Sequence, residues 1–174
     1  MNRSWFSIKV KYSKPDQDGT ESKVTEEYLV NAYSYTEAET RMYQVIADEL
    51  GTAAEVATIS RNNYAEVLRY DAGDAWWKAK ITLVSFDEES GKERQTNQSL
   101  LVQAADIKDA YEKLNKKLGK GAMEFLIPNI GFTKITEVYE WDGASKDIAE
   151  LEAQGFTSVK KSKMKPSEEF QEEE

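Results

Sequence analysis

Cysteine and histidine are both absent from this chain of 174 residues. Without cysteine there are no disulfides, no thiolate nucleophiles and no thiolate metal ligands. Without histidine the chain lacks the commonest general base, the usual zinc ligand and any serine–histidine triad. Catalysis would have to rest on carboxylates, lysine, tyrosine or an oxygen-liganded metal, so the composition favours a protein that is not an enzyme. The lack of cysteine also fits a reducing cytoplasm, which is the location we expect.

Long apolar runs are missing as well, so we expect no transmembrane helix, no secretory signal and no association with a membrane. Acidic residues outnumber basic ones by 32 to 23, which gives a net charge of −9. Nucleic-acid phosphates repel such a chain unless its cations gather on one face, so direct nucleic-acid binding is not expected. The acidic stretches at 16–19 and 87–89 lack the full ligand pattern of a calcium loop, so we expect neither a metal nor a cofactor.

What the chain does contain is an internal repeat. Residues 5–10 read WFSIKV and residues 76–81 read WWKAKI, while residues 29–32 read LVNA and residues 101–104 read LVQA. Similarity at a fixed spacing of this kind predicts two copies of one small structural unit.

Each copy is predicted to contain two strands, one helix and a long closing strand. The opening strands alternate apolar and polar residues, and each is followed by a hairpin turn, which contains Gly19 in the first copy and Gly91 in the second. Ser34 and Glu37 form a capping box before the first helix, and Asp106 takes the cap position before the second. The closing segments span residues 56–70 and 125–141, and each has a bend partway that could split it in two.

The sequence therefore predicts an α+β fold: a tandem duplication of a β-β-α-β unit, with a mostly antiparallel sheet and helices on one face. The first repeat spans residues 1–71 and the second spans residues 76–142. Because the linker at 72–75 is so short, we expect the repeats to pack as one domain around a shared sheet. Residues 143–174 form a charged C-terminal extension, basic and then acidic, which we expect to be partly disordered.

Several stretches resemble a known family. They include KVKY at 9–12, VTEEYLVNA at 24–32, YTEAE at 35–39 and LVQA at 101–104. Together they resemble an uncharacterised domain family, a domain of unknown function, that is common in gut Bacteroidetes, their phages and their conjugative elements. The resemblance covers residues 5–142 and brings no established activity and no catalytic residues. It implies an intracellular protein of a phage or mobile element, a setting in which counter-defence is common.

Two tryptophans and two lysines occupy matching places in the two copies. Trp5 and Trp76 lie on the strand face opposite the predicted core, close in sequence to Lys9 and Lys80. An aromatic ring beside a cation could stack a planar, anionic ligand such as a nucleotide. The alternative is that the other copy, the C-terminal extension or a partner subunit covers this face, since aromatic residues often mark interfaces.

A second candidate site is the bend of the first closing segment. Arg61, Asn62, Asn63 and Tyr64 offer a guanidinium, two amides and a phenol, which suit phosphates and base edges. The alternative is a polar bend without a ligand, because asparagine readily occupies turns. The second copy keeps neither the arginine nor the phenol, so a site here would be used only once.

We therefore expect a non-catalytic binding protein of a phage or mobile element. Its partner would be a nucleotide-type immune signal that it sequesters, or a host protein that it covers. One alternative is an acidic nucleic-acid mimic that inhibits a host DNA-binding protein. Another is a carboxylate-based enzyme, which would require two acids that converge in a cleft with a perturbed pKa. Asp71 and Asp142 end the closing segments at matching positions, but aspartates at strand ends are ordinary and the sequence does not place these two as a catalytic pair. The protein could be a monomer, since the duplication contains its own pseudo-dimer, or a homo-oligomer paired through an open edge strand.

Overall fold

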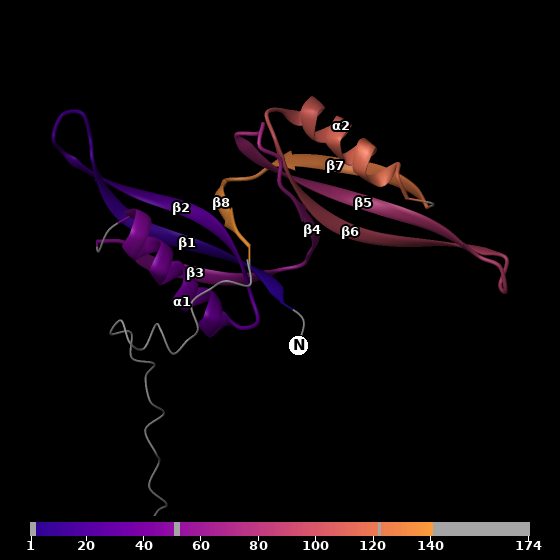
Figure 1. The fold of residues 1–174 in the computed structure, drawn as a ribbon, viewed down its shortest axis with the longest axis horizontal. Helices are drawn as coiled ribbons and strands as arrows, with labels where there is room; N and C mark the ends of the chain where they lie inside the picture. The colour runs from indigo at the N-terminus through magenta and orange to yellow at the C-terminus, as the bar shows by residue number, and fades with distance from the viewer. Residues whose placement is uncertain (1–2, 51–52, 122, 141–174) are drawn as a thin grey trace, which may run out of the picture. The chain divides into compact units, whose positions relative to one another are not determined.

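Two four-stranded mixed sheets, each with one helix, make up the fold in the computed structural model (Figure 1). Residues 3–50, 53–121 and 123–140 are described. The α+β class and the two similar units agree with the sequence-based prediction. The predicted C-terminal extension with its charged blocks, residues 143–174, lies outside the described residues.

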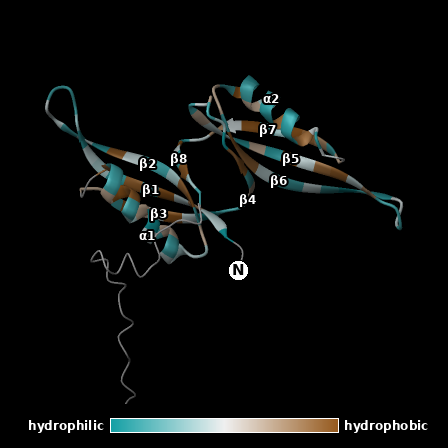
Figure 2. Cartoon of the chain, in the orientation of Figure 1, coloured by the Kyte–Doolittle hydropathy of each residue, from teal (hydrophilic) through white to brown (hydrophobic). Residues whose placement is uncertain are grey.

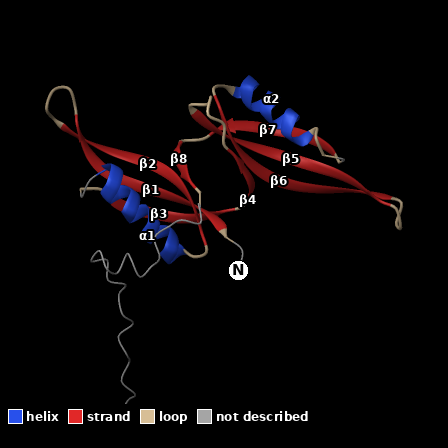
Figure 3. Ribbon diagram, in the orientation of Figure 1, coloured by secondary structure: helices blue, strands red, loops and turns tan. Residues whose placement is uncertain are grey.

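The elements follow the same order in both repeats (Figure 3). The first sheet has the strand order β3-β1-β2-β8 and consists of β1 (Ser4–Pro15), β2 (Glu21–Ala32), β3 (Glu55–Asn62) and β8 (Ile135–Tyr139). The second has the order β4-β6-β5-β7 and consists of β4 (Tyr64–Leu68), β5 (Ala75–Asp87), β6 (Lys92–Ala104) and β7 (Glu124–Phe132). The helices are α1 (Tyr35–Val45), continued by a π-helical turn (Ile46–Leu50), and α2 (Ile107–Leu118).

Both hairpins turn at the predicted glycines. Gly19 has a φ of 76° and Gly91 a φ of 64°, conformations that glycine adopts without the steric cost of a side chain. The repeat extends to strand register, because Trp5 pairs with Asn31 between β1 and β2 just as Trp76 pairs with Gln103 between β5 and β6.

Both helices begin at the predicted caps. The backbone N–H of Glu37 donates to Ser34 Oγ at 3.1 Å, and that of Asp109 donates to Asp106 Oδ1 at 2.8 Å. In return, the carboxylates of Glu37 and Asp109 each accept from the backbone N–H just before the cap residue. This reciprocal bonding satisfies donors that the first helical turn leaves free. Neither described helix is long and apolar enough to cross a membrane.

The closing segment of each repeat is split in two, and its second half joins the sheet of the other repeat. β4 of the first repeat pairs in parallel with β6, and β8 of the second repeat pairs in parallel with β2. The two pairings are equivalent, because Val67 pairs with Leu101 just as Val138 pairs with Leu29. We call this arrangement the strand exchange.

The expectation of one shared sheet was wrong, and chain geometry explains why. β3 lies at one edge of its sheet. The position beside β2 at the opposite edge, which β8 occupies, lies about 14 Å away, on the far side of β1 and β2. Only Asn63 separates β3 from β4, a link that spans at most about 7 Å. The chain therefore cannot return to β2 of its own repeat, and β4 enters the neighbouring sheet instead.

Each sheet packs one face against its own helix. Apolar residues of β1 and β2 bury Ala38 and Met42 of α1, and those of β5 and β6 bury Ala110 and Leu114 of α2. In Figure 2 brown apolar bands cross neighbouring strands, while the visible outer faces of the two helices are largely teal. The alternation predicted from the sequence is the alternation that forms these two cores.

A third buried cluster, which we call the exchange core, combines residues of both repeats. Its buried members are Leu29, Trp76, Leu101, Ile135 and Val138, and the partly buried Trp5, Tyr64 and Val67 pack against it. These residues come from the sheet faces opposite the helices and from the exchanged strands. The strand exchange thus contributes apolar burial as well as backbone pairing.

Replacing Leu101 by alanine should lower the free energy of unfolding by about 2–5 kcal/mol, because a fully buried leucine of the exchange core is lost. Leu126→Ala is the matched control: its side chain is 57% exposed on β7, and the change should stay within about 0.5 kcal/mol. Urea denaturation measures both values. Equal losses in the two variants would show that the exchange core does not stabilise the fold.

Residues 1–71 expressed alone should form a homodimer. In a single copy β4 cannot reach the edge of β2, and Leu29 would lack the apolar cover it has in the full chain. In a dimer, β4 of each copy can pair with β2 of the other. Light scattering after size exclusion measures the mass, and a folded monomer would contradict the prediction.

Candidate functional site

An open pocket of about 600 Å³ lies on the face of the second sheet opposite α2. Two lysines, four amides, two hydroxyls, a glycine and a phenylalanine line it: Lys78, Lys80, Asn63, Asn97, Gln98, Asn129, Ser99, Thr133, Gly131 and Phe132. The described residues that line this pocket include no carboxylate, although the chain as a whole is acidic.

The alternation of β5 places both lysines on this face. Ala79 and Ile81 point into the core under α2, so Lys78 and Lys80 point the other way and are exposed. Cross-strand register then decides which side chains join them. Ser99 of β6 and Asn129 of β7 flank Lys80 on its two sides.

The first repeat contributes to this pocket of the second sheet. Asn63 lines it, and the next residue, Tyr64, begins the exchanged strand β4. The Nζ atom of Lys78 lies 5.5 Å from the centre of the Tyr64 ring, within the range of a cation–π interaction. Burial raises the pKa of Tyr64, and the charge of Glu27 adds to this effect, so the ring stays neutral at physiological pH.

The equivalent face of the first sheet carries different chemistry. Ser7 occupies the position of Lys78, and Glu27 occupies that of Ser99. The hydroxyl of Ser7 donates to the Glu27 carboxylate, so the first repeat has an acid where the second has the neutral Ser99. The scaffold is duplicated, whereas the cationic pocket is not.

The structure separates the predicted tryptophan–lysine pairs. The Trp76 ring is only 2% exposed within the exchange core, and Trp5 is partly buried against the same cluster. Residues of the first repeat therefore cover Trp76, as the alternative interpretation of this face predicted. Lys80 does line the pocket, while Lys9 is exposed on the first sheet opposite Glu27.

The predicted group at the bend is divided in the same way. Arg61 donates from Nη2 to Ser4 Oγ at 2.6 Å, and Asn62 pairs with Trp5 at the end of β3. Of this group, Asn63 lines the pocket. The Tyr64 ring lies close to Lys78 Nζ, and Lys78 in turn lines the pocket.

Lys78, Asn97, Asn129 and Gly131 were not identified from the sequence. Strand alternation does place Lys78 beside Lys80 on one face, but Lys78 has no lysine counterpart in the first copy and was not chosen as a candidate. The other three residues come from β6 and β7, and only the register of these strands with β5 brings them together.

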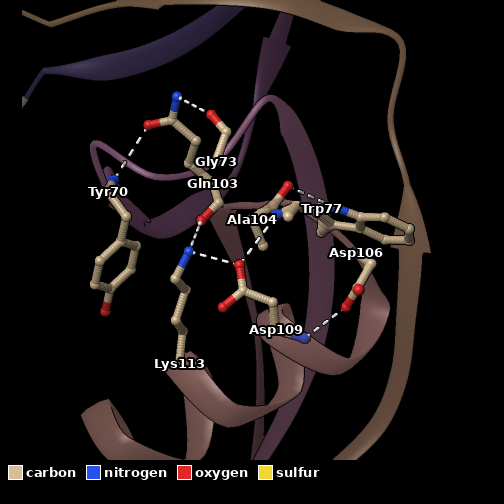
Figure 4. A network of polar contacts seen from close by, with 9 residues as sticks. Tyr70, Gly73, Trp77, Gln103, Ala104, Asp106, Asp109 and Lys113 are labelled. Atoms are coloured by element: carbon tan, nitrogen blue, oxygen red, sulfur yellow. Dashed lines mark hydrogen bonds and ion pairs between the residues drawn. The ribbon is translucent and has the colours of Figure 1, made fainter.

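A second polar cluster joins the end of β6, the linker between the repeats and the start of α2 (Figure 4). Gln103 accepts from the backbone N–H of Tyr70 at 3.1 Å and donates to the carbonyl of Gly73 at 2.9 Å. Lys113 Nζ donates to the Gln103 carbonyl at 3.2 Å and to Asp109 Oδ2 at 2.7 Å. Because these groups satisfy one another, we interpret the cluster as a structural clamp on the linker.

The predicted acidic pair stays untested. Asp71 is exposed at the end of the first repeat, and Asp142 lies outside the described residues. Within residues 3–50, 53–121 and 123–140, no group of three or more carboxylates is placed to hold a metal ion.

The pH dependence of stability tests the clamp. The hydrogen bond from Lys113, followed by that from the Ala105 N–H, lowers the pKa of Asp109. Because the pKa of Asp109 is lower in the folded chain than in the unfolded chain, its ionised carboxylate stabilises the fold at pH values above the unfolded pKa of about 3.9. This stabilisation is lost as the pH falls through the folded-state pKa. The stability difference between the native protein and Lys113→Met should therefore shrink below about pH 4 in urea denaturation.

Lys108→Met is the matched control, because Lys108 lies 3.9 Å from Glu112 in an exposed pair on the same helix. NMR titration should also show a higher Asp109 pKa in Lys113→Met than in the native protein. An unchanged Asp109 pKa would contradict the assigned role of Lys113.

No curated protein and no solved structure matches the chain. A family model does match, over residues 4–141, a range that includes both sheets and both helices. Its description names no activity, so it assigns no role to the cationic pocket. The chain belongs to the family described as Domain of unknown function (DUF4494).

Proposed function

We propose that this is a non-catalytic binding protein that holds a small, nucleotide-type anionic ligand in the pocket on the second sheet. One observation carries the proposal: two lysines and four amides line the pocket without a carboxylate, in a chain with a net charge of −9. A net negative charge disfavours anions on average, so a local pair of cations without a neighbouring carboxylate favours anion binding at this pocket.

The pocket also suits such a ligand in size and polarity. Its volume of about 600 Å³ lies within the range of small-molecule sites. Lysine ammonium groups form charge-assisted hydrogen bonds to phosphates, and asparagine amides both donate to and accept from base edges or sugar hydroxyls. Phe132 contributes less, because its ring packs edge-on against Trp77 at 5.5 Å.

The absence of histidine and cysteine supports binding rather than turnover. The side chains that line the pocket are cationic or neutral, and none is a carboxylate that could act as a general base. We therefore propose retention of an unchanged ligand.

The biological setting rests on the sequence resemblance. Under this proposal the protein is a cytoplasmic accessory protein of a phage or mobile element, and its ligand is a nucleotide-type immune signal of the host. Sequestration lowers the free concentration of such a signal without any chemical step. A host protein remains the partner to seek if no small anion binds.

Adding ADP at one hundred times its Kd should stabilise the native protein by about 2.7 kcal/mol, measured by thermal shift and calorimetry. Lys80→Ala should weaken ADP binding by about tenfold or more, because a hydrogen bond to a charged group is lost. Raising the salt concentration should weaken binding as well.

Lys23→Ala is the matched control, since it removes the same charge from an exposed position on β2 of the first sheet. It should leave ADP affinity unchanged. Equal weakening in both variants would indicate nonspecific attraction, and no response to any nucleotide or phosphate would overturn the proposal.

A further inference from the structure

We infer that the ligand carries two neighbouring anionic groups and a flat ring, as a nucleoside diphosphate does. The anionic groups meet Lys78 and Lys80, and the ring lies on the backbone of Gly131. This inference rests on the proposed function and specifies the ligand of the same pocket.

The two lysines favour two anionic groups over one. They lie two residues apart on the same face of β5, so their Cβ atoms are about 6.6 Å apart. Lys78 faces the Tyr64 ring, whereas Lys80 lies in the row of Ser99 and Asn129. The cations thus have different surroundings, and two linked anionic groups can each pair with one of them.

Gly131 supplies an open floor beside Lys78. It lies in β7 directly opposite Lys78, and it is not among the described glycines with positive φ. A Cβ at Gly131 would meet only Asn129 Oδ1, at 3.7 Å, which is an ordinary contact. Neither backbone conformation nor packing therefore requires glycine here.

The first repeat shows what the same position accepts. Its equivalent is Ser60, which pairs with Ser7 as Gly131 pairs with Lys78. A side chain is thus compatible with this point of the fold. A glycine inside a strand often marks the close approach of a ligand to the backbone, and a flat ring can use the space left by the missing side chain.

Amides next to this floor are available to the edge of a ring. Thr133 and Asn97 are already engaged, since Thr133 Oγ1 donates to the Trp76 carbonyl at 2.7 Å and Asn97 Oδ1 accepts from Thr82. Within the described part of the chain, the side chains of Asn63 and Asn129 form no hydrogen bond to protein. Each can donate and accept at the rim of the pocket.

Calorimetry of the full chain with AMP, ADP and pyrophosphate tests the inference. ADP should bind about tenfold or more tightly than AMP, which lacks the second phosphate, and than pyrophosphate, which lacks the ring. Gly131→Leu fills the floor and should weaken ADP binding by about tenfold while leaving pyrophosphate binding within about threefold. Ser60→Leu places the same side chain at the equivalent point of the first repeat and should change neither.

Circular dichroism of each variant reports folding. Gly131→Ala serves if the leucine variant is unfolded, because its Cβ would make only an ordinary contact with Asn129 Oδ1. Equal affinities for the three probes would overturn the inference and leave the proposed anion site standing. Unchanged ADP affinity in a folded Gly131→Leu would overturn the placement of the ring. No binding of any probe would overturn both proposals.

Discussion

The whole structure depends on the short covalent link between β3 and β4, two consecutive strands that pair in different sheets. Asn63 alone joins β3 to β4, and β3 occupies the sheet edge opposite the free edge of β2. Only the neighbouring sheet is within reach, so each repeat completes the other. The parallel pairing and the exchange core both follow from this constraint, because the exchanged strands bring their apolar side chains with them.

The same constraint positions the pocket. The exchange core buries Trp76 and Leu101 on the outer face of the second sheet, and this burial ends one step along β5, at Lys78. The polar part of the face begins there, beside Tyr64 from the exchanged strand. A side chain of the first repeat thus borders a site built mainly by the second, so the site depends on the strand exchange as well as on local sequence.

Local features could be predicted from the sequence, whereas pairings across the chain could not. Hairpin glycines and helix caps act within a few residues, so Gly19, Gly91, Ser34 and Asp106 were identified correctly. Alternation also identified the outer strand face, but it carries no information about what covers that face. For this reason Trp76 was a candidate ligand contact although it is buried, and Lys80 was the candidate lysine that proved to line the pocket.

Comparison of the two repeats distinguishes residues that the fold requires in both copies from residues that it does not require. Both repeats have a leucine on the central strand and a valine on the exchanged strand, as Leu29 with Val138 and Leu101 with Val67, because each sheet must bury the same contact. The outer faces differ where the fold imposes no such demand. Lysine and glycine in the second sheet replace two serines in the first. Since the fold accepts either set, packing does not require Lys78 or Gly131, and the proposed ligand is the reason we offer for them.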